Sequence, residues 1–272
     1  MAGNVIWLIG EELPADRFAR MMTVAPLLLD YHTPVMTAAT RSARSSRFRL
    51  KYLLIAMLVL VISWHLWAFM QVLSWRHDTP AMSAFMLQDL QNRQLSNPNA
   101  DLSQHVVAYD HISPRLKRAV IAAEDASFVQ HHGFDLDGIQ LALEKNLKAG
   151  RIRAGGSTIT QQLAKNLFLS GERSLWRKVE ESVFTVMLEA TLSKQRILEL
   201  YLNYAEWGNG IYGAEAAARH YYGIPASMLS VRQAARLAAI LPNPRYYDGH
   251  HTRWIARRTH TIARYMPMVL IP

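Results

Sequence analysis

The sequence contains no cysteine among its 272 residues. This absence excludes a disulfide framework, a thiolate metal site and a cysteine nucleophile. It leaves the redox compartment open, because a cysteine-free chain folds equally well in oxidising and reducing surroundings. Internal repeats and low-complexity segments are also lacking. Half of the residues are apolar and a tenth are aromatic, which excludes wholesale disorder. The length favours one sizeable domain with an appendage.

Acidic residues are in deficit: 21 Asp and Glu stand against 30 Lys and Arg, which gives a formal net charge of +9. A basic chain can bind nucleic acid or a membrane surface, so the position of the charge is decisive. A cluster of cations directly precedes residues 52–75, an apolar segment without Asp, Glu, Lys or Arg. The clustered cations are Arg41, Arg44, Arg47, Arg49 and Lys51.

This apolar segment has the length of a membrane-spanning helix, since about 20 apolar residues cross a bilayer. Basic residues beside such a segment favour the cytoplasmic side. We therefore expect a single uncleaved anchor over residues 52–75, with the chain from residue 76 onward outside the cytoplasm and away from nucleic acid. One alternative is a buried helix of a soluble domain. A cleaved signal peptide is disfavoured, because the segment is too long and starts too far from Met1.

The chain is expected to have four parts. Residues 1–51 are interpreted as a cytoplasmic tail, or as the product of an over-extended start upstream of Met36. The anchor at 52–75 is followed by a polar connector over residues 76–110. Residues 111–272 form the main domain, where strand signals are scarce, so we expect a mainly α fold.

Helix-start signals recur along the main domain. Ser113 followed by Pro114 combines an N-cap residue with proline at the first helical position. Asp135 can cap a second helix that stops at Gly150. Thr158 begins a capping box for a third helix. The apolar residues of the second helix that we expect to face inward are Leu136, Ile139, Leu143 and Leu147.

The first candidate for chemistry is the carboxylate pair Glu124 and Asp125 at the end of the first helix. The helix dipole disfavours negative charge there, so a carboxylate beside Phe128 would have a raised pKa and could act as a general base. The alternative is a solvated helix end with Asp125 in a turn. His131 and His132 are adjacent and point in different directions, so structural hydrogen bonding is favoured over a metal site.

The second candidate is the glycine-rich segment before the third helix. Gly155 and Gly156 let the backbone approach a ligand closely, and a helix start behind them presents free N–H groups that suit an anion. The alternative is a tight loop and a capped helix. That alternative accounts for the glycines and Thr158, but not for the polar and cationic side chains that could point together. These side chains are Gln161, Gln162 and Lys165.

The third candidate is Arg177 with Glu181, four residues apart on one helical face. Alone, such a pair is ordinarily a surface pair worth a few tenths of a kcal/mol. Together the three segments supply two separated carboxylates, a glycine-rich anion cradle and four or five cations. This combination suits a reaction at a sugar carbon with an anionic leaving group, in which one carboxylate takes a proton and the cations hold a phosphate. The membrane anchor suggests that this phosphate is attached to a lipid.

Four motifs stand in order with short gaps. They are Glu124-Asp125-x-x-Phe128-x-x-His131-x-Gly133, Gly155-Gly156-Ser157-Thr158-Ile159-Thr160-Gln161-Gln162-x-x-Lys165-Asn166, Arg177-Lys178-x-x-Glu181 and Ile197-Leu198-Glu199-x-Tyr201-Leu202-Asn203. On these motifs the chain resembles the family 51 peptidoglycan glycosyltransferases over roughly residues 111–247. Later segments resemble the monofunctional biosynthetic branch of that family.

The resemblance implies a lysozyme-like, two-lobed helical domain that polymerises lipid II into linear glycan strands by inverting transfer and releases undecaprenyl diphosphate. Glu124 and Glu181 would be catalytic. Glu124 would be the general base for the acceptor 4-hydroxyl, and Glu181 would position the cations or bind a divalent metal, Mg²⁺ or Mn²⁺. No organic cofactor is implied. Residues implied to bind the diphosphate or the donor are Lys165, Arg173, Arg177, Lys178, Ser157, Gln161 and Gln162. Motif residues with an expected structural role are Asp125, Phe128, His131, Gly133, Gly155, Gly156, Asn166, Glu199, Tyr201 and Asn203.

The resemblance further implies a single-pass protein of the bacterial inner membrane with its catalytic domain on the periplasmic side. Expected partners are lipid II, the growing strand, the membrane and cell-division or elongation proteins. No Ser-x-x-Lys with a later Lys-Thr-Gly is present, so the strands would not be cross-linked by this chain. Leu141 stands where many bifunctional members carry arginine, and Lys145 is one turn further on.

Two alternatives belong to other classes of protein. A peptidoglycan-cleaving, lysozyme-like enzyme would use a catalytic glutamate on the same polymer but needs no phosphate site. An inactive membrane scaffold would need neither the carboxylates nor the cations, all of which are intact.

Overall fold

The structure is a computed structural model that describes residues 39–150, 155–169 and 174–272, with side chains from Arg49 onward. The expected tail before residue 39, the side chains of the clustered cations before Arg49, and Arg173 lie outside the described residues. The described part of the chain divides into a first unit that ends at Met57 and a second unit, Leu58–Pro272. Helix α1 (Ala39–Ser74) begins in the first unit and ends in the second.

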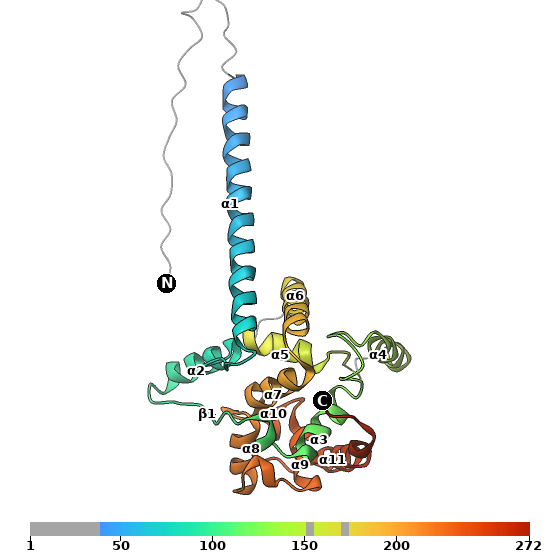
Figure 1. The fold of residues 1–272 in the computed structure, drawn as a ribbon. Helices are drawn as coiled ribbons and strands as arrows, with labels where there is room; N and C mark the ends of the chain where they lie inside the picture. Colours follow the sequence, from blue (N-terminus) through green and yellow to red (C-terminus); the bar gives the residue numbers. More distant parts are fainter. Residues whose placement is uncertain (1–38, 151–154, 170–173) are drawn as a thin grey trace, which may run out of the picture. The chain divides into compact units, whose positions relative to one another are not determined.

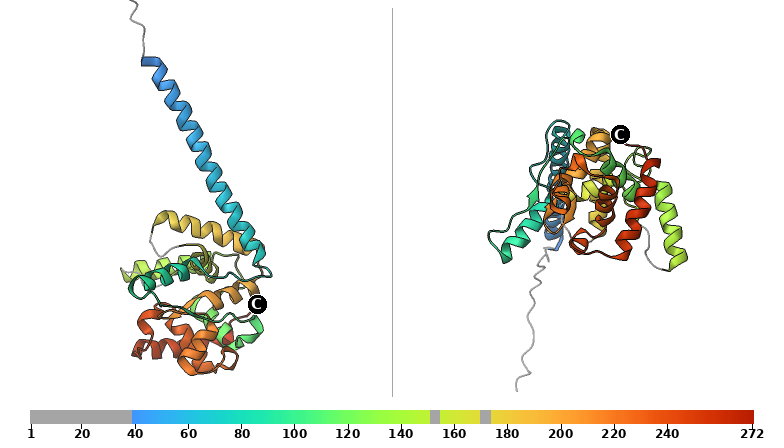
Figure 2. Two further views of the ribbon diagram at one scale, coloured as in Figure 1. Left: turned by 90° about the vertical axis from the view of Figure 1, so that its left-hand side faces the viewer. Right: turned by 90° about the horizontal axis from the view of Figure 1, so that it is seen from below.

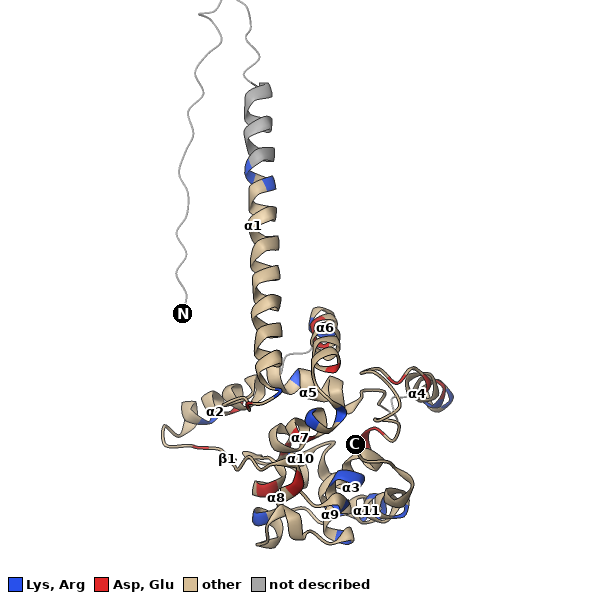
Figure 3. Cartoon of the chain, viewed as in Figure 1, with Lys and Arg blue, Asp and Glu red and all other residues tan. Residues whose placement is uncertain are grey.

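The apolar stretch of α1 runs over 26 residues, Arg49–Ser74, and is long and apolar enough to cross a membrane. Figure 3 shows no charged residue along the helix after Lys51 at the start of this stretch. Within the second unit the last turns of α1 are part of the fold. Ala68, Val72 and Trp75 are buried in its core. The backbone carbonyl of Trp75 also accepts a hydrogen bond from Arg196 Nε at 2.8 Å.

The second unit is built almost entirely from helices (Figure 1). After α1 its α-helices are α2 (Ala84–Ser96), α3 (Pro114–Glu124), α4 (Leu136–Ala149), α5 (Ile159–Phe168), α6 (Leu175–Thr191), α7 (Lys194–Tyr204), α8 (Ala214–Tyr222), α9 (Val231–Ile240), α10 (Pro244–Tyr247) and α11 (Arg253–Tyr265). Short 3-10 helices cover Tyr109–His111, Ala226–Met228 and Met266–Met268. The strands are β1 (Ser103–Gln104), β2 (Glu206–Gly208) and β3 (Ile211–Tyr212).

Two groups of helices pack around the site. In one group, α5 lies against α2, α6 and α7. In the other, α9 lies between α3 and α11, which Figure 2 shows side by side. The mainly α, two-lobed fold expected from the sequence is thereby confirmed.

The three strands form one small sheet in the order β1-β3-β2. Strand β1 pairs in parallel with β3, with Ser103 opposite Ile211, and β2 pairs with β3 in antiparallel fashion with an irregularity between Glu206 and Gly208. Residues expected to form a polar connector therefore supply a helix, α2, that packs on α5, and a strand, β1, that joins the sheet.

The expected helix starts are confirmed. Ser113 caps α3 with Pro114 in the first turn, and Asp135 caps α4, which ends at Gly150 in the left-handed conformation with φ of 60°. The expectation that the apolar face of α4 points inward is wrong. Leu136 and Leu147 are 74% and 72% exposed, and Ala142 is the one buried residue of this helix. Periodicity identifies the apolar stripe of a helix, but the described residues leave this stripe exposed.

Candidate active site

Glu124 is the last residue of α3, which ends there because Asp125 takes a non-helical backbone conformation with φ of −164°. The Glu124 side chain is only 13% exposed. Its two oxygens have different partners: Oε2 accepts a hydrogen bond from Gln162 Nε2 at 2.9 Å, and Oε1 lies 3.1 Å from Arg258 Nη2. The carboxylate is thus held between the two groups of helices, by α5 on one side and α11 on the other.

The environment of Glu124 disfavours its charged form. Burial raises the pKa of the carboxyl above its ordinary value of 4.5, although the Gln162 hydrogen bond and the cations Arg258 and Lys165 lower it. Burial penalises an ion because the protein interior solvates charge poorly. A carboxylate whose pKa is displaced toward neutrality is suited to take up a proton from a substrate.

Gln162 is oriented by a second hydrogen bond. The Tyr201 hydroxyl, from α7, donates to Gln162 Oε1 at 2.9 Å. With its oxygen occupied, the amide presents its nitrogen to Glu124. The ring of Tyr201 is buried, so this chain of contacts is built into the core.

Asp125 has a different role from its neighbour. Its Oδ2 accepts the backbone N–H of Ile159 at 2.9 Å, and its Oδ1 lies 2.9 Å from His131 Nε2. The structural hydrogen bonding expected of His131 is thereby confirmed. Asp125 and the Thr158 hydroxyl accept the N–H groups of Ile159 and Gln161 at the start of α5, so these two groups are not free for an anion as the sequence led us to expect. A carboxylate of the protein already takes that place.

Gln161 does not share the orientation of Gln162. It completes the capping box of α5, with its Oε1 accepting the Thr158 backbone N–H at 3.0 Å, and it is buried. The expected grouping of Gln161, Gln162 and Lys165 on one face therefore fails at Gln161. The capping box predicted from the sequence is confirmed, and it is the box that turns this amide inward.

A cluster of cations surrounds Glu181 on α5 and α6. Burial lowers the pKa of the Lys165 ammonium; Glu181 and Glu124 oppose this effect, whereas Arg177 and Lys178 lower the pKa further. Glu181 is buried and forms an ion pair with Lys178. Arg177 Nε is buried without a hydrogen-bond partner in the part of the chain that the structure describes. Three cations around one buried carboxylate leave an excess of positive charge that an anion would balance.

A cavity of about 360 Å³ opens beside Glu124. Its described lining includes Asp125, Ser157 and Lys145 together with the backbone at Gly155 and Gly156. Leu141 is exposed and does not line this cavity, whereas Lys145, one turn further along α4, does. The structure thus brings Lys145 to the same cavity as the candidate base.

The residues present do not form a complete metal site. Among the described residues, no group of three or more His, Cys, Asp or Glu could hold a metal ion. Glu181, the expected metal ligand, is engaged with Lys178. A divalent ion bound through Glu181 remains a prediction, and none of the chemistry below depends on it.

Comparisons with known proteins identify the family of the chain. Residues 91–267 match the protein family described as Transglycosylase. The chain belongs to this transglycosylase family. It is 56% identical over 218 residues to a biosynthetic peptidoglycan transglycosylase of Laribacter hongkongensis, which covers 80% of this chain and 96% of the relative. It is 58% identical over 220 residues to a biosynthetic peptidoglycan transglycosylase of Methylobacillus flagellatus. This match covers 80% of this chain and 96% of the relative.

Membership confirms the resemblance read from the motifs, and the chain is an enzyme of the peptidoglycan glycosyltransferase class.

The remaining motif residues of this transglycosylase connect its elements. Phe128 is fully buried. The Gly133 carbonyl accepts the Thr158 hydroxyl at 2.7 Å, and with φ of +87° a side chain on Gly133 would meet Thr185. Asn203 exchanges two hydrogen bonds with the backbone of Val107. Glu199 pairs with Arg196 at 2.8 Å. Asn166, on α5, is half-buried.

Sequence reasoning missed one residue of the transglycosylase site, Arg258. It forms an ion pair with Glu124 at 3.1 Å and also donates to the Ala123 carbonyl at 3.3 Å. Its position on α11, more than one hundred residues from Glu124, has no spacing signal that would connect the two.

Proposed function

We propose that this transglycosylase polymerises lipid II into linear peptidoglycan strands, with Glu124 as the general base. The observation that carries the proposal is a buried carboxyl group with a raised pKa on the wall of a cavity, near a cluster of cations. The names of the relatives, biosynthetic peptidoglycan transglycosylases, support the substrate class. The full chain has no second set of catalytic motifs for cross-linking.

The proposed step transfers one proton and exchanges one bond. The 4-hydroxyl of the acceptor sugar gives its proton to Glu124 as its oxygen bonds to C1 of the donor. The bond from C1 to the diphosphate oxygen breaks, and undecaprenyl diphosphate leaves with the electron pair. Attack opposite the leaving group inverts the configuration at C1 from α to β. Glu124 then returns its proton to solvent.

Each described group has one task in this step. Gln162 and Arg258 hold the Glu124 carboxylate in place. Lys165, Arg177 and Lys178 offset the negative charge that develops on the departing diphosphate, and Glu181 holds these cations together. Ser157 and Lys145 line the cavity beside Glu124 and are positioned to contact substrate there. The motif also assigns Arg173 to the diphosphate.

The proposed location is the inner membrane, with α1 as the anchor and the second unit on the periplasmic side. The support is the apolar stretch Arg49–Ser74 and the basic residues that precede it. Cell-division or elongation proteins are proposed partners on the resemblance alone.

The cleaving alternative is disfavoured by the cations. Hydrolysis or lysis of a finished strand has no diphosphate leaving group to neutralise, so the cluster around Glu181 would have no function in it. The test is to incubate the purified full chain in detergent with labelled lipid II and Mg²⁺, and in parallel with finished strands, and to separate the products on a gel. Ladders from lipid II support the proposal. Shortened strands without ladders would replace it with a cleaving enzyme, and inertness toward both would favour the scaffold.

A further inference from the structure

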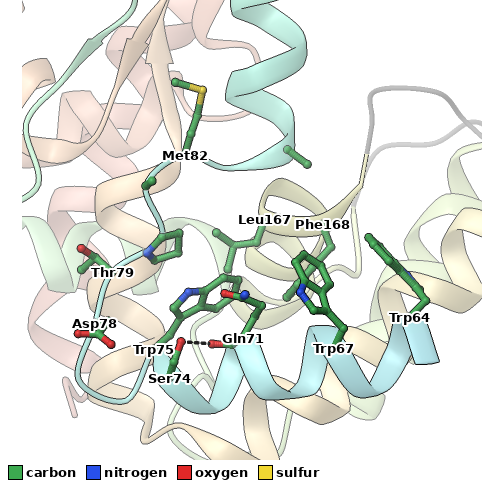
Figure 4. Close-up of a pocket in the computed structure, with 13 residues that line it drawn as sticks. Trp64, Trp67, Gln71, Ser74, Trp75, Asp78, Thr79, Met82, Leu167 and Phe168 are labelled. Atoms are coloured by element: carbon green, nitrogen blue, oxygen red, sulfur yellow. Dashed lines mark hydrogen bonds between the residues drawn. The ribbon is translucent and has the colours of Figure 1, made fainter. Parts of the chain in front are cut away.

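A second cavity, of about 470 Å³, lies within the second unit where α1 ends. Figure 4 shows Trp64 and Trp67 on α1, and Trp75 directly after it, on the same side of the cavity as Leu167 and Phe168 at the end of α5. The segment after α1, including Met82, lies across the cavity from the helix. None of the residues assigned to the proposed transfer step lines it.

Trp64, Trp67, Trp75 and Phe168 supply the aromatic rings of its apolar wall. Phe168 stacks on Phe184 of α6 with ring centroids 4.2 Å apart, and its ring centroid lies 5.3 Å from that of Trp75. Trp64 and Trp67 stack on each other at 5.1 Å. These two indoles are still 47% and 52% exposed, although they belong to the packed end of the anchor. The wall therefore offers a large apolar surface that no described side chain covers.

The cavity also has a polar end. Gln71, Ser74, Asp78 and Thr79 line it, and the Ser74 hydroxyl donates to the Gln71 carbonyl at 2.8 Å. Asp78 is the one ionisable residue in the lining as described. The described lining contains no Lys or Arg to pair with a phosphate headgroup, and the neighbouring Arg196 is engaged by the backbone carbonyls of Trp75 and Asp78. The occupant that fits is an uncharged apolar chain whose charged end lies elsewhere.

The charged end of such a molecule can bind at the cation cluster around Glu181. Phe168 follows Lys165 by one turn on α5, and Phe184 follows Glu181 by one turn on α6. Residues three apart lie on the same side of a helix, about 4.5 Å apart along its axis. The aromatic pair is therefore the next layer after the charged pair on the same two helices. A diphosphate held at Lys165 would place the beginning of its attached chain beside Phe168.

We propose that the cavity between α1 and α5 binds the polyprenyl chain of the diphosphate-linked donor, and of the polyprenyl diphosphate released from it. The inference rests on the proposed function and extends it to the lipid part of the substrate. The end of the anchor would then be part of the substrate-binding surface as well as a tether. A membrane phospholipid is the competing occupant, and the tests below distinguish the two.

The first test compares two donors with the full chain in vesicles of phosphatidylethanolamine and phosphatidylglycerol. One donor carries a long polyprenyl chain and the other a single isoprene unit. Trp67→Ala removes a half-exposed ring, so the fold should persist, which a thermal unfolding scan checks. We expect KM for the long-chain donor to rise about fivefold to tenfold, because the variant loses the apolar contact of one ring. KM for the short-chain donor should stay within about twofold of the wild-type value.

The matched control is Leu66→Ala on the same helix, since Leu66 is exposed but does not line the cavity. It should leave KM for both donors unchanged. Equal effects of Trp67→Ala on the two donors, or no effect on either, would overturn the inference. If the wild-type chain polymerises neither donor, the proposed function itself fails, which is a different outcome.

The second test identifies the occupant. A polyprenyl diphosphate with a photoreactive group on its chain should label the peptide between Lys51 and Arg76, and excess unlabelled polyprenyl diphosphate should abolish that labelling. A photoreactive phospholipid should label this peptide weakly. Labelling that survives the competitor, or equal labelling by the phospholipid, would assign the cavity to membrane lipid and overturn the inference.

Discussion

Gln162 donates a hydrogen bond from Nε2 to Glu124 Oε2 across 2.9 Å, and this contact joins α5 to the end of α3. The amide can do so in one orientation only, because its oxygen already accepts the Tyr201 hydroxyl. Glu124, the candidate base, is therefore positioned by Gln162 of a second motif. Gln162 is in turn positioned by Tyr201 of another motif. This arrangement gives each of the three motifs a physical reason to be present.

Replacing Tyr201 with phenylalanine should slow the reaction without touching substrate. The amide of Gln162 would lose its orienting partner and spend less time as a donor to Glu124. We expect kcat to fall about threefold to tenfold with KM nearly unchanged, since the loss of one buried hydrogen bond costs about 1–3 kcal/mol, shared between stability and orientation. The control is Tyr212→Phe, which removes a buried hydroxyl bonded to Asp89 at 3.0 Å, away from the site. Equal kcat values for the two variants would refute the orienting role.

Replacing Arg258 with alanine should change the pH profile. The guanidinium of Arg258 lowers the pKa of Glu124 against the effect of burial, so its removal should raise that pKa further. The base must be deprotonated to act, and activity is therefore lost as the pH falls through its pKa. The acid limb of kcat/KM should consequently move to higher pH in Arg258→Ala. Arg257→Ala, an exposed neighbour on α11, should leave it in place. An unshifted acid limb in Arg258→Ala would contradict the ion pair's role.

Lys145 offers a test of the cavity beside Glu124. Lys145→Ala should raise KM for lipid II about fivefold while changing kcat little, because an exposed cation contributes modestly to binding an anionic substrate. Lys148→Ala is the matched control, since Lys148 is an exposed lysine of the same helix outside the described cavity lining. Similar KM values for both variants would place Lys145 on the surface rather than in the site.

Asp125 should matter for stability more than its neighbour does. Asp125→Ala would leave the Ile159 N–H and His131 without their buried acceptor, and we expect a loss of about 2–4 kcal/mol in the free energy of unfolding. Thermal unfolding of the full chain in detergent measures this. Asp137→Ala, at an exposed position in the first turn of α4, should cost well under 1 kcal/mol. Equal losses would show that the α3–α5 connection does not depend on Asp125.

Local signals in the sequence predicted much of the architecture. Ser113, Asp135 and Thr158 cap the helices that their side chains predict, because capping depends on residues within one turn. The apolar segment of the anchor was also predicted from the sequence, because a candidate membrane span is recognised by its length and composition alone. Helix α2 was missed. Only Met86 and Asp89 are buried in it, so it has no regular apolar stripe to detect.

Contacts between distant segments were harder to predict. Glu124 was found because a carboxylate at a helix end is unusual, but Arg258 reaches it from α11 through the tertiary fold alone. The exposed apolar stripe of α4 is a second example. Periodicity predicts that a helix has an apolar face, but it does not predict which element packs against that face. Gln161 and Gln162 are adjacent and chemically identical, and only the capping box separates their roles.

The central claim is that Glu124 acts as the base, and the most direct measurement compares Glu124→Gln with the wild-type chain on lipid II. Because burial raises the pKa of this carboxyl, its charged form costs stability as the pH rises, so the neutral isostere should unfold no earlier than wild type at pH 7. We expect donor binding to be retained and strand synthesis to fall by at least about a hundredfold. A folded, donor-binding Glu124→Gln variant that still polymerises lipid II at a substantial fraction of the wild-type rate would contradict this account.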